Sequence, residues 1–482
     1  PYRWQRPRAL PPCYRYGTRA NPGRFTGGTG VCPQPAESEK ELHDEDCLQV
    51  NVWIPIGDAP KDGWPVLFYI HGGFLQWGSP NGLSPSLFLS STSIRCIIVA
   101  PGYRLNALGF LATPTLASPD SPSPGNYGFW DQRLALQWTH QNISLFGGNA
   151  SNVTVAGYSA GSHSTFYQLA YDLYLPDPKK RVIKRVMMLS NGPGLQPKTL
   201  DEHRTQFLQL TKELGISETV PEDQKLEKLR KLPAETIVDA AGRIRIHEFR
   251  AVSDGEFVRK DLFRDINNGT FAAKVKQAGV KMIIGECRDE HFAYAIWRPP
   301  SNTREGVYER LRADYPEEAC KRLMNLYSPK GGLPNGVESW TDLFGRIYAD
   351  VQIYCLERGF VDKLVKAGCI PGVDVLRYRM EWRIKNCWAP PEWGVTHATD
   401  MAIWFCGNGD VLEKGEGDVI IKWLHPVKTF LEGGDIDWGT SDIQDVRRLN
   451  NGGQVDLWRD DRWEEGLETW DLLTKEKPMA NL

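Results

Sequence analysis

The sequence predicts an α/β fold in which helices flank a mostly parallel central sheet. Short apolar runs typical of buried strands alternate with stretches of helical periodicity, which indicates βαβ units. One of these runs leads directly into GYSAG at 157–161 and then into a helix of small and apolar residues. Charged helical sequence without strand signals interrupts the alternation twice. We therefore expect one domain over residues 1–482, with helical lid insertions at about 199–245 and 304–366.

The expected elements can be followed along the chain. Residues 1–45 are rich in Pro, Gly and Arg and are predicted to form surface loops. A strand of alternating polarity follows at 47–54, and the apolar spacing within 126–145 predicts a helix. The polar tail at 424–482 has no predicted role. Further strands are expected at 65–70, 96–100, 153–156, 186–189, 280–284 and 373–380.

Composition and charge exclude several classes of function. The formal net charge is −3, so the composition does not indicate a basic surface for binding nucleic acid or an anionic membrane. No apolar run reaches the roughly 18 residues of a membrane span. The scattered Cys and His lack zinc-site spacing, so no metal and no cofactor is predicted. The expected partner is a small molecule, bound by a monomer or a homodimer.

Ser159 is the candidate nucleophile. It lies between Gly157 and Gly161, at the point where a predicted strand changes into a predicted helix. Glycines at these positions allow a sharp turn and close packing of helix on strand, which raises the serine hydroxyl above the sheet. The bare pattern is common, so it predicts catalysis only with a base and an acid in context.

A serine hydroxyl needs a base, normally histidine, and the histidine needs an acid on its other nitrogen. In folds with this serine turn the chain order is serine, acid, histidine. Of the histidines after Ser159, His397 lies in a loop that follows the strand expected at 373–380. The acid should follow an earlier strand, and the end of the strand at 280–284 leaves Asp289 and Glu290 as alternatives.

Long segments between residues 45 and 400 match a known family. They are EDCLQVNVW (45–53), YIHGGF (69–74), GYRLNALGFL (102–111), NYGFWDQRLALQW (126–138), NISLFGGNASNVTVAGYSAG (142–161), VSDGEF (252–257), IIGECRDEHF (283–292) and GVTHATD (394–400). Through them the chain resembles the type-B carboxylesterases and cholinesterases, fungal carboxylesterases included, which are α/β-hydrolases. The resemblance implies the α/β-hydrolase fold. It also implies Ser159 and His397 as catalytic residues and selects Glu290 as the acid.

The resemblance also implies an oxyanion hole and a disulfide. The family binds the oxyanion with backbone N–H groups of a triple-glycine turn and of the residue after the serine. Here these groups belong to Gly73, Phe74 and Ala160, with Phe74 replacing the third glycine. The family's first disulfide corresponds to Cys32 and Cys47.

Departures from the family pattern bear on the substrate. The family's choline-binding tryptophan has no counterpart, Tyr158 replaces the glutamate before the serine, and Ala293 replaces an aromatic residue. Choline esters are therefore poor candidates, because little remains to hold a quaternary ammonium by cation–π contact. The residues that flank the motifs and are expected to line the pocket are Leu75, Trp77, Tyr294, Trp404 and Phe405.

Four glycosylation sequons are present, of which Asn142 and Asn268 are the favoured acceptors. Together with the implied disulfide they favour a secreted protein, with a cytoplasmic one as the alternative.

The sequence thus predicts a serine carboxylic-ester hydrolase that acts through an acyl-enzyme on a small to medium, uncharged ester. The same triad also suits a lactone or thioester hydrolase, or an acyltransferase of secondary metabolism. A non-catalytic adhesion homologue is the third hypothesis, which the complete triad disfavours.

Overall fold

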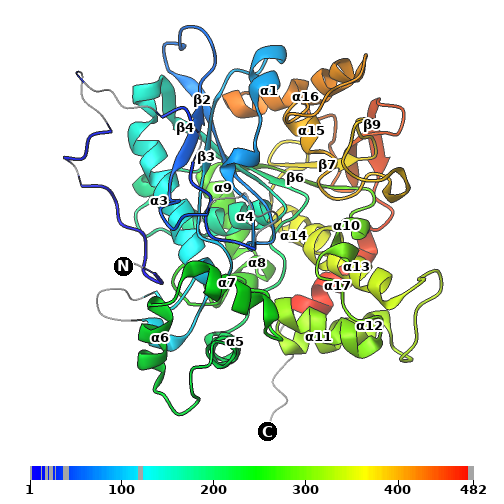
Figure 1. The fold of residues 1–482 in the computed structure, drawn as a ribbon. Coiled ribbons are helices and arrows are strands. Elements are labelled where there is room, and N and C mark those ends of the chain that lie inside the picture. Colours follow the sequence, from blue (N-terminus) through cyan, green and yellow to red (C-terminus); the bar gives the residue numbers. More distant parts are fainter. Residues whose placement is uncertain are drawn as a thin grey trace.

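The computed structural model describes residues 3–11, 13–16, 20, 25–27, 29–35, 43–117 and 123–475. Over these residues nine strands form one sheet (Figure 1). In sheet order they are β1 (Val50–Trp53), β3 (Ile97–Pro101), β2 (Trp64–Ile70), β4 (Gly148–Tyr158), β5 (Arg185–Leu189), β6 (Lys281–Cys287), β7 (Val375–Met380), β8 (Asp445–Leu449) and β9 (Val455–Arg459). The edge strands β1 and β9 pair antiparallel, and the strands between them are parallel. The predicted α/β fold with a mostly parallel sheet is confirmed.

The apolar runs of the sequence bury both faces of this sheet. Successive side chains of a strand point to opposite faces. In β2, Val66 and Phe68 accordingly enter one core, whereas Leu67 and Tyr69 enter the other. A parallel sheet with two apolar faces requires helices on both.

Two sets of helices cover the two faces (Figure 1). The larger core receives α3 (Tyr127–Asn142), α4 (Ala160–Leu173), α9 (Thr270–Ala278) and α14 (Cys355–Lys366). The opposite core receives α1 (Ser86–Ser91), α15 (Met401–Trp404) and α16 (Glu416–Glu432). Shorter helices fill the connections: α2 (Asn106–Phe110), α8 (Leu262–Asn267) and α10 (His291–Ile296).

The two charged stretches of the sequence are helical, as expected. The first contains α5 (Leu200–Glu213), α6 (Glu222–Arg230) and α7 (Ala234–Arg243). The second contains α11 (Arg304–Asp314), α12 (Glu317–Tyr327), α13 (Trp340–Ala349) and a π-helical turn at Asp350–Tyr354 that runs into α14. In Figure 1 helices α5, α6, α7, α11 and α12 lie together along the lower side of the molecule. That they act as a lid, within a single domain, stays a prediction.

The polar tail, to which the sequence assigned no role, completes the sheet. It supplies β8, β9 and α17 (Trp463–Thr474). The last helix packs on α14 through Trp470, and a Cβ at Gly359 would lie only 2.3 Å from that side chain. The strands DVRRL and VDLWR escaped sequence detection because they are short and rich in charge.

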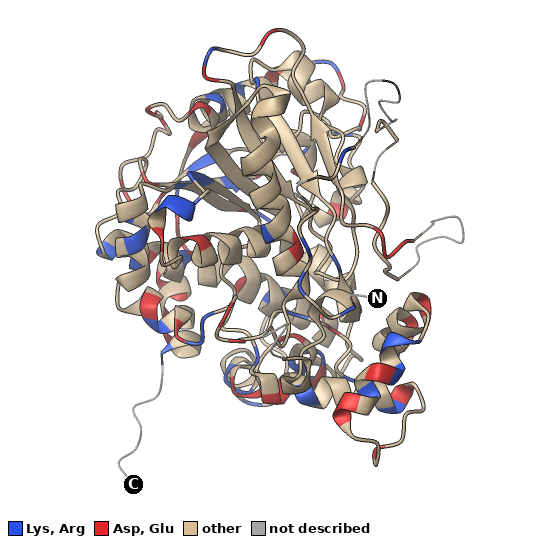
Figure 2. Ribbon diagram, turned by 90° about the vertical axis from the view of Figure 1, so that its left-hand side faces the viewer, with Lys and Arg blue, Asp and Glu red and all other residues tan. Residues whose placement is uncertain are grey.

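The helices of the described ranges include none that is both long and apolar enough to cross a membrane. Lys and Arg are interspersed with Asp and Glu on the face shown in Figure 2, rather than gathered by sign. This distribution agrees with the small net charge.

Candidate active site

Ser159 occupies a strained turn between β4 and α4. Its backbone angles are φ 56° and ψ −124°, a region that residues other than glycine rarely adopt. A Cβ at Gly157 would lie 2.1 Å from the Gly161 carbonyl oxygen, and one at Gly161 would lie 2.0 Å from that of Ile70. Only glycine fits at these two positions, as the serine-turn motif requires. Strain held in place by packing in this way is typical of functional sites.

Glu290 and His397 meet at the same edge of the sheet. The strands β2, β4, β6 and β7 run in one direction, so the segments that follow them lie along one edge. His397 Nδ1 lies 2.6 Å from Glu290 Oε2, and Glu290 Oε1 accepts a hydrogen bond from the Cys287 N–H (2.8 Å). Glu290 is fully buried, and this burial raises its pKa although the adjacent His397 lowers it.

Asp289, the alternative acid, contacts a different part of the loop. Its Oδ2 accepts hydrogen bonds from the Val395 N–H and from Arg288, both at 2.9 Å. Its own N–H donates to the Val395 carbonyl (2.9 Å). Asp289 thus anchors the segment that carries His397, two residues before the imidazole.

Tyr294 contacts both Ser159 and His397. Its hydroxyl lies 3.3 Å from His397 Nδ1 and 3.4 Å from Nε2, and it interacts with the Ser159 hydroxyl. Within the described residues no direct hydrogen bond joins Ser159 to His397. The structure therefore brings the three predicted residues to one place, with Tyr294 in contact with both nucleophile and base.

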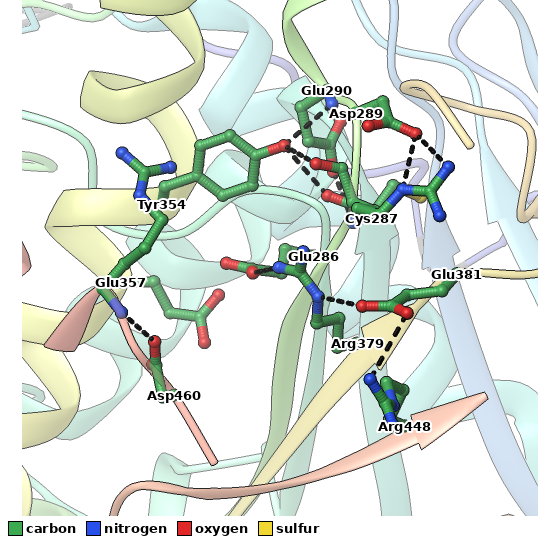
Figure 3. Close-up of polar contacts among 12 residues, drawn as sticks. Glu286, Cys287, Asp289, Glu290, Tyr354, Glu357, Arg379, Glu381, Arg448 and Asp460 are labelled. Atoms are coloured by element: carbon green, nitrogen blue, oxygen red, sulfur yellow. Dashed lines mark hydrogen bonds and ion pairs between the residues drawn. The ribbon is translucent and has the colours of Figure 1, made fainter. Parts of the chain in front are cut away.

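Two tyrosines that the sequence did not assign to the site hold its loops. The Tyr158 hydroxyl donates to Asp400 Oδ1 (2.6 Å) and accepts from the Ala398 N–H (2.8 Å), one residue after His397. The Tyr354 hydroxyl accepts from the Glu290 N–H (2.8 Å) and donates to carbonyl oxygens of the same loop (Figure 3). The π-helical turn that carries Tyr354 gave no recognisable signal in the sequence.

The turn after β2 places backbone donors beside the nucleophile. Gly73, Phe74 and Leu75 all have positive φ, at 98°, 57° and 62°. A Cβ at Gly72 would lie 3.1 Å from that of Ser159, so this turn passes directly along the serine. Across the described part of the chain, the N–H groups of Gly73, Phe74 and Ala160 find no hydrogen-bond acceptor. These are the donors that the sequence assigned to an oxyanion hole.

A small pocket of about 60 Å³ opens beside Ser159. Leu75 and Tyr294 line it, as expected, but Trp77, Trp404 and Phe405 do not. Trp404 and Phe405 lie instead in the apolar core on the α16 face, because the loop after His397 turns back toward the sheet. Lining residues that the sequence did not indicate include His163, Asn191, Arg250, Asp314, Tyr348 and Gln352.

The predicted disulfide is confirmed, because Cys32 and Cys47 are joined. Of the two favoured glycosylation sites, Asn268 is exposed, whereas Asn142 donates its amide N–H to the Trp138 carbonyl (2.8 Å). Glycosylation stays a prediction at both.

A buried ion cluster supports β6, the strand that leads to Glu290 (Figure 3). Glu286 in β6 accepts a hydrogen bond from Arg358 (2.8 Å) and pairs with Arg379. Asp460 pairs with the same Arg358 at 2.9 Å. Alternating charges of this kind hold β6, α14 and the tail in register.

Glu357 is the cluster member that lacks a strong partner. Arg377 Nε lies 3.5 Å from its Oε1, and its buried Oε2 has no hydrogen-bond partner among the residues described. Burial raises the pKa of Glu357 to about 8, because the attraction of Arg377 is too weak to offset it. The folded protein therefore retains this proton at pH values at which the unfolded chain has lost it.

We expect Glu357→Gln to stabilise the protein more at pH 8 than at pH 5. In this window the free energy of unfolding of the wild type falls as pH rises, by up to about 1.4 kcal/mol per pH unit. It falls because only the unfolded chain releases the proton. Glutamine removes this dependence, so its advantage should grow by about 3.5 kcal/mol across the window, given a folded-state pKa of about 8. Thermal unfolding at both pH values measures it, with the exposed Glu468→Gln as the matched control. An equal advantage at the two pH values would contradict the raised pKa.

The comparisons with known proteins agree with this geometry. The model of the carboxylesterase family matches residues 2–414. A carboxylic ester hydrolase of Gibberella moniliformis is 45% identical over 98% of this chain and 89% of its own length. An uncharacterized esterase/lipase of Schizosaccharomyces pombe is 38% identical over 97% of this chain and 88% of its own length.

A solved structure supports the fold. The crystal structure of Aspergillus niger EstA superposes with a TM-score of 0.76 and covers 98% of this chain and 91% of that one, at 20% sequence identity. At this identity the likeness concerns the fold alone. The chain therefore belongs to the carboxylesterase family and, as the sequence predicted, is a hydrolase with the α/β-hydrolase fold.

Proposed function

We propose that the protein is a serine carboxylic-ester hydrolase that uses Ser159, His397 and Glu290. The observation that carries the proposal is the 2.6 Å contact between His397 Nδ1 and the buried Glu290, at the same sheet edge as the strained Ser159 turn. The contact leaves Nε2 of His397 as the nitrogen that can accept a proton. Three side chains that are far apart in the sequence thus supply nucleophile, base and orienting acid.

The reaction proceeds in two acyl transfers. Ser159 Oγ forms a bond to the ester carbonyl carbon while its proton passes to His397 Nε2. The C–O bond to the alcohol then breaks, and His397 returns the proton to the departing oxygen. A water molecule repeats these steps on the acyl-enzyme, which releases the carboxylic acid and the free serine.

The contact of Tyr294 with Ser159 belongs to the resting site in this proposal. A serine side chain changes rotamer readily, and the hydrogen bonds of a catalytic site often tighten only when substrate is bound. Rotation about the Cα–Cβ bond of Ser159 would exchange Tyr294 for His397 as the partner of its hydroxyl. The Gly73, Phe74 and Ala160 N–H groups would then receive the oxyanion.

Lactone or thioester hydrolysis and acyl transfer to another alcohol use the same groups, and they form the second hypothesis. The close contact of Glu290 with His397 disfavours a non-catalytic adhesion role, which would not need a buried carboxylate held on an imidazole. The disulfide between Cys32 and Cys47 supports secretion, because such bonds persist in oxidising compartments.

The direct test is product analysis with matched esters, lactones and thioesters of short acyl chains. We expect release of acid from esters with normal Michaelis kinetics, and an initial burst of 4-nitrophenol from 4-nitrophenyl esters as the acyl-enzyme accumulates. Turnover of lactones or thioesters with little turnover of esters would favour the second hypothesis. Absence of turnover on every acyl donor would contradict the enzymatic proposal.

A further inference from the structure

The pocket beside Ser159 has a charged wall. Arg250 and Asp314 are the charged residues among its lining, and the other lining side chains are apolar or neutral polar groups. The α5–α7 stretch and α11 bring them there, since Arg250 follows the first insertion and Asp314 ends α11 in the second. An uncharged ester does not explain why a guanidinium lines this pocket.

Most of the Arg250 donors are already used. Nε donates to Asp314 Oδ1 (2.7 Å), and Nη2 lies 3.1 Å from the Tyr348 hydroxyl and 3.0 Å from Glu248 Oε2. Nη1 has no hydrogen-bond partner among the described residues. It is also absent from the unpaired side-chain atoms that are fully shielded from solvent, so part of its surface is exposed. Its N–H groups are therefore accessible, on a residue that lines the pocket.

Asp314, the acid on the same wall, already uses both of its carboxylate oxygens. Asp314 Oδ1 accepts from Arg250 and from the Tyr348 hydroxyl (3.2 Å), and Oδ2 pairs with Arg310. Burial would raise the pKa of Asp314, but Arg250 and Arg310 outweigh it and hold the pKa well below its usual value. Asp314 is thus an ionised group whose two oxygens already have donors.

The charges around this wall do not cancel. Two carboxylates, of Glu248 and Asp314, face three guanidinium groups, of Arg250, Arg298 and Arg310. His247 also lies near Glu248, but burial lowers its pKa, so it adds no charge near neutral pH. The cluster therefore has one excess positive charge, and the accessible N–H groups of Arg250 present that charge to the pocket.

Aromatic rings connect Arg250 to the reacting centre. Tyr348 bonds to Arg250 and packs on Tyr294 with ring centroids 4.9 Å apart, and Tyr294 contacts His397. Phe74 lies 5.7 Å from the Arg250 guanidinium and 5.9 Å from the Tyr294 ring. A ligand whose carbonyl reaches Ser159 would thus have apolar contacts along its length and a cation at its far end.

We propose that Arg250 binds a carboxylate of the substrate, so that the preferred substrates are esters that carry a second, free carboxylate a few carbon atoms from the reacting carbonyl. A guanidinium with N–H groups left over suits a carboxylate because the hydrogen bond is charge-assisted. The inference rests on the proposed function and changes its substrate class, since the sequence suggested an uncharged ester. The carboxylate can belong to the acyl part or to the alcohol part.

Two matched pairs of substrates test the inference on the wild-type protein. Ethyl hydrogen glutarate is compared with ethyl 4-carbamoylbutanoate, and 4-acetoxybutanoate with 4-acetoxybutanamide, so that only the charge of the distal group differs. In at least one pair we expect kcat/KM to favour the carboxylate by about tenfold or more, the size expected for a hydrogen bond to a charged group. The pair that shows the preference tells which side of the ester faces Arg250.

Variants then assign the preference to Arg250. We expect Arg250→Gln to bring the carboxylate-to-amide ratio close to one, and Arg250→Lys, which keeps the charge, to retain part of it. The matched control is Arg245→Gln, because the Arg245 side chain is 62% exposed and pairs with Glu309. The control should keep the full ratio. Because the readout is a ratio, a lower amount of folded variant does not change it.

Two results would overturn the inference. Equal or faster hydrolysis of the amides in both pairs by the wild type would do so and would leave the ester-hydrolase proposal standing. A full preference retained in Arg250→Gln would show that another group binds the carboxylate. Failure to hydrolyse any ester would remove the proposed function itself and the inference with it.

Discussion

Replacement of Ser159 by alanine is expected to lower kcat for ester hydrolysis by about a million-fold, to the level that binding and the oxyanion donors alone support. Without the hydroxyl no acyl-enzyme can form, and His397 has no proton to accept. The measurement is kcat on a 4-nitrophenyl ester, together with mass spectrometry of the protein after treatment with a fluorophosphonate. The wild type should carry one adduct on the peptide that contains Ser159, and the variant none.

Ser162→Ala is the matched control for this experiment. Ser162 lies in α4, the helix that begins directly after Ser159, but its hydroxyl is buried and donates to the Asn191 carbonyl (2.7 Å). The control should therefore react with the fluorophosphonate at a rate close to that of the wild type. Labelling of Ser159→Ala at the wild-type rate would mean that another residue is the nucleophile. Failure of the folded wild type to react would contradict the serine mechanism altogether.

The parts of this site that could be predicted are those that carry local signals. The Gly157-Tyr158-Ser159-Ala160-Gly161 turn was recognisable because its glycines are a steric requirement, as their contacts with the Gly161 and Ile70 carbonyls show. The acid and the base were found because parallel strands end at one edge, so the chain order alone restricts the candidates. Continuous apolar runs such as that of β2 likewise predict strands buried on both faces.

The parts that could not be predicted depend on packing between distant segments. Arg250 and Tyr348 meet Ser159 only because two helical insertions fold over the same sheet edge, and their local sequence does not reveal it. Trp404 is the converse case. It follows His397 by seven residues and was therefore expected in the pocket, but its indole N–H donates to Asp400 (2.9 Å) and its ring enters the core.

Tyr158 departs from the family pattern, and only the structure shows which residues its side chain contacts. By sequence it was the residue that replaced a glutamate. In the structure its hydroxyl connects the serine turn to the histidine loop through Asp400 and the Ala398 N–H. Burial raises the pKa of Asp400, while the hydrogen bond from Tyr158 lowers it. The nucleophile and the base are thus held by adjacent residues of one network.

Replacement of Glu290 by glutamine is expected to lower kcat by about ten-thousand-fold, the loss seen when the carboxylate of such a triad is made neutral. The side chain keeps its shape, so the fold should survive, but the amide no longer holds the imidazole in one tautomer or stabilises its charged form. Asp289→Asn is the matched control, because its remaining oxygen can still accept from the Val395 N–H. The control should lose less than tenfold in kcat, since it leaves the Glu290–His397 contact intact. Similar losses in the two variants would mean that the loop geometry, and not the Glu290 charge, is what matters.

The dependence of activity on pH gives this assignment an independent readout. Burial raises the pKa of Glu290 above that of an exposed glutamate, and the carboxylate form is the one that serves His397. As pH falls through this raised pKa, Glu290 takes up a proton and the wild-type rate should decrease, at a higher pH than an exposed glutamate would give. In Glu290→Gln the group no longer titrates, so the acidic limb of the kcat/KM profile should differ in position from that of the wild type. An acidic limb unchanged in the variant would mean that the titration of Glu290 does not set it.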